Sequence, residues 1–168
     1  MTDKRLTVLL LLTLLAASAP LSAAPAGGGM PAVQLLDSGV QCPPVNDQPE
    51  AVLIDDRQRL QRFASRLRGA ILSPSIPRLP AIDFERQRVL YISAGKRPTA
   101  GYSLTLDEPP FTLDGETAVL HLRLNTPPPD RMVAAVVTYP CILVRIPAQG
   151  YSAIEIRGLG QVLELPSR

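Results

Sequence analysis

From Arg88 onward the sequence is a series of short apolar or alternating segments, separated by prolines and glycines. The chain carries 18 prolines in 168 residues, and proline interrupts helices because it lacks an amide donor and clashes with the preceding turn. Short segments at close spacing are typical of antiparallel sheets. The sequence therefore predicts a mainly β fold, an antiparallel β-sandwich or barrel. The expected strands are residues 88–93, 101–106, 117–124, 132–138, 141–146, 152–156 and 161–165.

The clearest strand and turn follow one another directly. Asp114-Gly115 is a strong hairpin turn after the short apolar segment 111–113. In the strand 117–124 apolar residues alternate with others, so one face is expected inside and His121 and Arg123 outside. The expected inward residues are Ala118, Leu120, Leu122 and Leu124.

One helix is expected before these strands. Asp55-Asp56 provides an N-cap and suits the positive end of the helix dipole. Apolar residues recur at helical spacing after it. They are Leu60, Phe63, Ala64, Leu67 and Ile71. The helix is expected to pack on an open edge or face of the sheet, and residues 51–54 are a strand or the lead-in to the helix. Five arginines at positions 57, 59, 62, 66 and 68 form a solvated face or bind an acidic partner.

The first 26 residues have the layout of a secretory signal peptide. Two cations precede an aliphatic run over residues 6–17, and small residues follow it. The run is shorter than the roughly 20 residues that a membrane-spanning helix needs, although an uncleaved anchor is the alternative. We therefore expect a signal peptide over 1–26, an Ala/Gly/Pro-rich linker over 27–50 and a β-rich domain over 51–165. The linker is expected to become ordered near residues 33–36, and Cys42 would attach it to the domain. The expected location is periplasmic or secreted.

The chain has two cysteines, Cys42 and Cys141. In an oxidising compartment a small even number of cysteines usually forms a structural disulfide. Free thiols are one alternative. A second is a nucleophilic Cys141, which needs a nearby base, and His121 is the only imidazole in the sequence.

The composition excludes several classes of function. A net charge of +2 is too balanced for an electrostatic nucleic-acid binder. One histidine and two cysteines cannot supply the four N/S ligands of a structural zinc site within one chain. No nucleophile elbow or phosphate-binding glycine loop is present. We expect a non-catalytic protein without a cofactor or metal, and an enzyme only if His121 or a free Cys141 lies in a pocket.

The most distinctive segment is the loop between the strands 88–93 and 101–106. Gly95 and Gly101 allow positive φ at both ends, Pro98 stiffens the middle, and Thr99 can hydrogen-bond local backbone. Such a loop is a hairpin tip of fixed conformation, which suits contact with a protein partner; the alternative is a structural hairpin that binds nothing. The expected partner-binding residues are Gly95, Lys96, Arg97, Pro98, Thr99, Ala100, Gly101, Tyr102, Tyr139 and Pro140, with residues 125–130 and Cys141 as further contacts.

Residues 80–157 resemble the C-terminal domain of the PrcB family, whose members are subunits of protease complexes. The resemblance rests on Asp83-Phe84 after Pro80, on the Pro98-Thr-Ala-Gly-Tyr102 motif, on the proline-containing connection 126–130 and on Pro140 before an aliphatic strand. It implies an exported, non-catalytic protein that helps to assemble or stabilise a protease, so an exported protease is the implied partner. The cysteine after Pro140 departs from the family pattern and fits a bridge to Cys42.

The segment Arg97-Pro-Thr-Ala-Gly-Tyr102 is also similar to the Asn-Pro-Thr-Thr-Gly-Tyr loop of chagasin-like cysteine-protease inhibitors. Those proteins are immunoglobulin-like β proteins that insert loops into an active-site cleft. Here Arg97 replaces the asparagine, Leu104 replaces a tryptophan, and a later Arg-Pro-Trp element is missing. This similarity implies protease inhibition as the alternative function.

Overall fold

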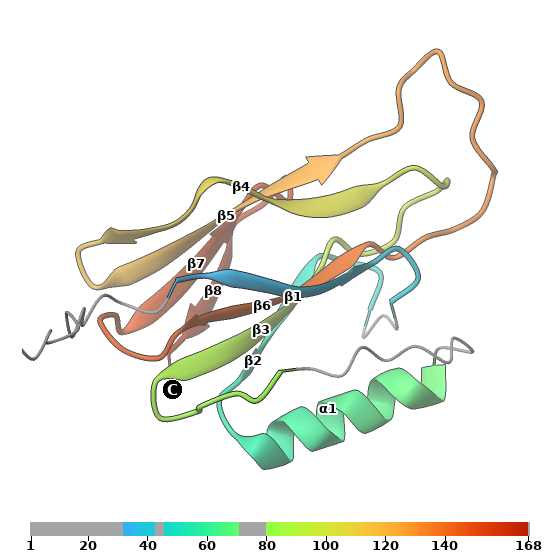
Figure 1. Ribbon diagram of the computed structural model, residues 1–168. Helices are drawn as coiled ribbons and strands as arrows, with labels where there is room; N and C mark the ends of the chain where they lie inside the picture. Colours follow the sequence, from blue (N-terminus) through green and yellow to red (C-terminus); the bar gives the residue numbers. More distant parts are fainter. Residues whose placement is uncertain (1–31, 43–45, 71–79, 168) are drawn as a thin grey trace, which may run out of the picture.

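Two four-stranded sheets face each other in the computed structural model, which describes residues 32–42, 46–70 and 80–167, without the side chains of 66–70 (Figure 1). The first sheet has the order β1 (Gln34–Gly39), β6 (Cys141–Pro147), β3 (Gln87–Ser93), β2 (Glu50–Ile54). The second has the order β4 (Ser103–Asp114), β5 (Thr117–Asn125), β7 (Ala153–Arg157), β8 (Leu163–Pro166). The expected mainly β sandwich is confirmed, and the barrel alternative is not, because the sheets do not close on one another.

The core fills the space between the two sheets with aliphatic side chains. Alternate residues of each strand point inward, as the period of two along a strand requires. The completely buried members include Leu90, Ile92, Leu120, Ile142, Ile146, Ile154 and Ile156. The inward set expected for β5 holds, since Ala118, Leu120 and Leu122 are buried and Leu124 packs partly buried against them.

The second sheet contains one parallel pair, β5 with β7, whereas an antiparallel sheet was expected. The parallel pairing follows from how the chain connects β5 to β7. Between them in the sequence comes β6, which belongs to the first sheet. The chain therefore crosses the sandwich twice and re-enters the second sheet in its earlier direction. Alternation within a strand carries no information about this choice.

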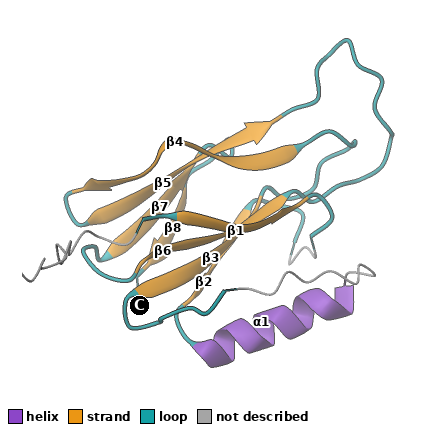
Figure 2. Cartoon of the chain, in the orientation of Figure 1, coloured by secondary structure: helices purple, strands orange, loops and turns teal. Residues whose placement is uncertain are grey.

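The helix α1 (Arg57–Ala70) covers the outer face of the first sheet (Figure 2). Asp56 caps it as expected, since its carboxylate accepts the Arg59 amide at 2.7 Å. Phe63 packs on Tyr91 of β3, with ring centroids 4.8 Å apart. Arg59 forms an ion pair with Asp55 at 3.1 Å, so at least one helix arginine has an acidic neighbour in its own chain.

Within the described ranges, no helix combines the length and the apolar character that crossing a membrane requires.

The sheet begins earlier than the expected domain boundary at residue 51. β1 lies inside the segment 27–50 that was expected to be a linker, and it pairs with β6 along its length. Leu36 packs against the smaller core under the helix, which explains why this part of the segment joins the fold. Residues 51–54 are a strand, part of β2. The expected signal peptide over 1–26 lies outside the described residues.

Two of the expected strands differ in the structure. Residues 103–106 of the first segment and the segment 111–113 belong to one long strand, β4, whose pairing with β5 shifts register between Leu106 and Phe111. The expected strand 132–138 is wrong, because these residues run outside both sheets and make only a single bridge, between Thr138 and Arg97.

Candidate functional site

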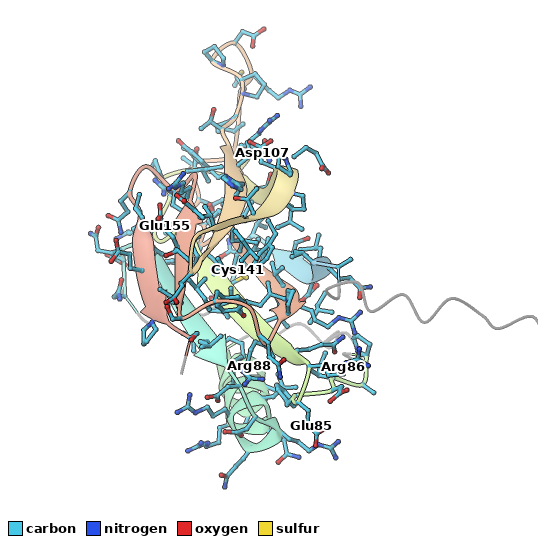
Figure 3. The ribbon with its side chains drawn as sticks, turned by 90° about the vertical axis from the view of Figure 1, so that its left-hand side faces the viewer. Glu85, Arg86, Arg88, Asp107, Cys141 and Glu155 are labelled. Carbon is cyan, nitrogen blue, oxygen red and sulfur yellow. A yellow bond between two sulfur atoms is a disulfide. The ribbon has the colours of Figure 1, made fainter. Side chains whose placement is uncertain are left out.

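Several connections meet at one end of the sandwich, and we call them the loop cluster. It consists of residues 94–102, which link β3 to β4, residues 126–140, which link β5 to β6, and residues 40–42 and 46–49 beside them. The connection between β5 and β6 projects beyond both sheets (Figure 1), and it forms the top of the molecule in the view of Figure 3.

The loop 95–101 is not the expected hairpin tip. β3 and β4 belong to different sheets, so the loop is a crossover at the end of the sandwich. Both glycines have positive φ, 74° at Gly95 and 92° at Gly101. A β carbon at Gly95 would approach the carbonyl oxygen of Asp47 to 2.7 Å, and one at Gly101 would approach Pro127 to 2.8 Å. The glycines thus permit close packing against neighbouring segments, in addition to the turn.

Backbone hydrogen bonds lock this crossover to the connection that projects. Arg97 and Thr138 exchange two amide-to-carbonyl bonds of 2.8 and 2.9 Å, and the Ala100 amide donates to the Ala134 carbonyl at 3.0 Å. The Thr138 hydroxyl, on a side chain that is 3% exposed, donates to the Thr99 carbonyl at 3.0 Å. The two connections therefore form one interlocked surface and not two independent loops.

A polar group joins residues 46–49 to the same surface. The Tyr139 hydroxyl donates to Asp47 at 3.1 Å, and the Lys96 ammonium lies 3.3 Å from the same carboxylate. Desolvation, followed by the hydrogen bond to Asp47, raises the pKa of the Tyr139 hydroxyl above its usual range. The Arg97 guanidinium lies 6.0 Å from the ring centroid of Tyr102 and donates to the Ala94 carbonyl at 2.6 Å.

The expected disulfide between Cys42 and Cys141 is present, with the two Cα atoms 6.0 Å apart. It joins the segment after β1 to the first residue of β6, near the centre of the molecule in Figure 3. Beside it, the Cys42 amide donates to the Tyr139 carbonyl at 3.1 Å and the Tyr139 amide to the Val40 carbonyl at 2.9 Å. In this bonded state Cys141 carries no thiolate and is not a nucleophile.

The expected partner-binding residues differ in their exposure. Lys96, Pro98 and Gly101 are exposed, whereas Gly95 and Pro140 are buried. The remaining ones, Arg97, Thr99, Ala100, Tyr102 and Tyr139, are half-buried. Pro140 is corrected as a contact residue, because its side chain lies inside the protein, where its carbonyl accepts the Ala94 amide.

The sequence reasoning missed the most exposed apolar residues of the cluster. Met132 is 99% exposed, and Val40, Val136 and Val137 are 47%, 45% and 41% exposed. Three of them lie in the segment that alternation and composition assigned to a strand. The available signal was the run Pro127-Pro128-Pro129 shortly before it, which separates that segment from β5.

His121 lies away from the loop cluster and from the disulfide. It is on β5 in the second sheet, with Nε2 2.9 Å from the Thr112 hydroxyl of β4, whereas Cys141 belongs to the first sheet. The alternative of a Cys141 thiol paired with this imidazole therefore does not match the structure, in which Cys141 is bonded to Cys42. Among residues 32–42, 46–70 and 80–167, no three His, Cys, Asp or Glu side chains gather as metal ligands would.

Residues 88–147 match a family model described as PrcB C-terminal. The matched segment runs from β3 to the end of β6 and so includes both connections that interlock in the loop cluster. No curated protein matches the chain, and no solved structure does. The similarity to chagasin-like inhibitors is not shown by these comparisons.

Proposed function

We propose that this chain is an exported, non-catalytic accessory protein of a protease complex, because its residues 88–147 match the PrcB C-terminal family model. The family name points to a protein associated with a protease complex. The loop cluster is the surface by which the chain holds its protein partner.

One observation carries this proposal. The segment that matches the family model brings residues 94–102 and 126–140 together, and their mutual hydrogen bonds hold them in one arrangement. A surface that is ordered before binding loses less conformational entropy in a complex. The cluster also exposes apolar side chains beside polar ones such as Lys96, the mixture found in protein interfaces.

The state of the cysteines supports the expected export. A disulfide persists in oxidising compartments, and it is rare in the reducing cytosol. Here the disulfide closes next to the backbone bonds of Tyr139, so an oxidising environment also stabilises the proposed binding surface. The same bond occupies the thiols on which an enzyme mechanism would depend.

The test is crosslinking inside the producing cells. A photoreactive amino acid replaces exposed Pro98 in the loop cluster, and the matched control places it at exposed Glu116, in the turn between β4 and β5 at the other end of the second sheet. We expect position 98 to crosslink to one exported protein that is a component of a protease complex, and position 116 to give no such product.

The outcomes separate the parts of this proposal. If neither position gives an adduct although both variants accumulate at the wild-type level, the binding role is wrong. If position 98 captures a protein unrelated to proteolysis, binding stands and the assignment to a protease complex is wrong. Addition of the purified protein to that protease then distinguishes a stabilising subunit, which extends the lifetime of the activity, from an inhibitor, which reduces its rate.

A further inference from the structure

Residues 132–137, which we call the open segment, have a composition that conflicts with their structure. Their sequence, Met-Val-Ala-Ala-Val-Val, is apolar and half of it is valine, a residue enriched in strands. In the structure they belong to neither sheet. Local conflicts of this kind are expected at functional sites, where a residue is selected for something other than the fold of the isolated chain.

Most of the backbone of the open segment has no hydrogen-bond partner among the described residues. Ala134 and Val136 share one bond, the Ala134 carbonyl also accepts the Ala100 amide, and the Val137 carbonyl accepts the Gln41 side chain. The amides of Met132, Val133, Ala135 and Val137 have none within the part of the chain that the structure describes. The segment thus presents unpaired amides, as an edge strand does, with one three-residue turn around Ala135 that must open if the whole segment pairs.

Most side chains of the open segment are also exposed. Met132 is 99% exposed, and Val136 and Val137 are more than 40% exposed. Apolar side chains beside unpaired amides are a liability in an isolated protein, and natural proteins usually protect such edges. The presence of exposed apolar side chains beside unpaired amides in this segment favours a role in which another molecule covers them.

The open segment is held in position at both ends. Three consecutive prolines, at 127–129, precede it and restrict the backbone there. After it, Thr138 is fixed by two backbone bonds and by its own hydroxyl. The crossover 94–102 is therefore the support of this surface, and the open segment is the part that projects from it.

We propose that residues 132–137 pair, as an added β-strand, with the exposed edge strand of the protein partner. This inference rests on the proposed function and names the contact that performs it. In such strand addition the main-chain bonds supply affinity, and alternate side chains supply specificity. Asp130 and Arg131, beside the segment, carry opposite charges, so the recognised edge is expected to be apolar and without strong net charge.

The test removes one amide that the chain itself does not use. Ala135→Pro deletes the Ala135 amide hydrogen, whereas the matched control Ala135→Ser keeps it on an equally exposed side chain. Both variants carry the photoreactive residue at position 98. We expect Ala135→Pro to reduce the crosslinked partner by about tenfold or more and Ala135→Ser to leave it within about twofold, while both unfold thermally at the wild-type temperature.

Hydrogen exchange provides a second measurement on the wild-type chain, which stays informative if the proline variant does not fold. We expect the unpaired amides of residues 132, 133, 135 and 137 to exchange rapidly in the free protein and to be protected in the purified crosslinked complex. The strand addition is wrong if these amides still exchange rapidly in the complex and Ala135→Pro does not reduce the crosslinked partner. The proposed function would then remain intact.

Two further results also decide the matter. Protection of 132–137 in the protein alone, together with a dimer in size-exclusion chromatography, means that a second copy covers the segment, and the assignment to a different partner is then wrong. If position 98 captures no protein at all, the proposed function fails and this inference fails with it.

Discussion

Removal of the disulfide between Cys42 and Cys141 should strongly reduce the stability of the protein. The two cysteines are 99 positions apart in the sequence, so the bond closes a loop of about 100 residues. In the chain-entropy model a loop of that size stabilises the folded state by about 4–5 kcal/mol, because the crosslink restricts the unfolded chain. The double variant Cys42→Ala with Cys141→Ala tests this without leaving a free thiol.

The assay is urea unfolding monitored by far-UV circular dichroism and by fluorescence. The fluorescence signal comes from tyrosine, since the sequence contains no tryptophan. We expect the free energy of unfolding to fall by about 3–5 kcal/mol, with a steeper dependence on urea because the uncrosslinked chain exposes more surface when unfolded. Wild-type protein unfolded with a reductant should behave like the double variant. A loss below about 1 kcal/mol would refute the argument from loop closure.

Three other changes test the packing of the fold. Phe63→Ala should destabilise the protein by about 3–5 kcal/mol, measured by urea unfolding, because the ring is 6% exposed and joins the helix to the first sheet. Gly158→Ala should lower the melting temperature far more than Gly160→Ala: both residues have positive φ, but only at Gly158 would the added carbon overlap a β5 carbonyl. Equal effects would contradict this. Burial raises the pKa of Tyr91 and of Tyr151 to about 12, against about 10 in an unfolded chain. The stabilising contribution of these two hydroxyls should therefore be constant below about pH 10 and be lost from about pH 10 to 12, so a urea midpoint that is the same near pH 9 and near pH 11 would contradict the burial of both hydroxyls.

The elements that local pattern could determine were predicted well. Leu120, Leu122 and Leu124 alternate with His121 and Arg123, and Asp114-Gly115 specifies the turn before them, so β5 and its inward face followed from the sequence alone. The helix followed from its apolar spacing and from the Asp56 cap. These features depend on contacts within a few residues, and their period is visible in one dimension.

The candidate site could be located only in part. The glycine positions and the Pro98-Thr-Ala-Gly-Tyr102 motif drew attention to the correct crossover, but they indicated a hairpin because they do not specify which sheet the next strand joins. The segment 132–138 has the composition of a strand and lacks a neighbouring strand. Pairing requires a partner in space, so strand propensity alone could not reveal that the partner is missing.

Taken by itself, the sequence determined the β-rich class, the capped helix, the alternation of the buried residues and the two cysteines available for one bridge. Each depends on side-chain chemistry and on short-range periodicity. The tertiary structure decided that β1 belongs to the first sheet, that β5 and β7 run parallel, and that residues 94–102 support residues 126–140. These outcomes depend on which distant segments meet, and that is settled by the packing of the whole chain.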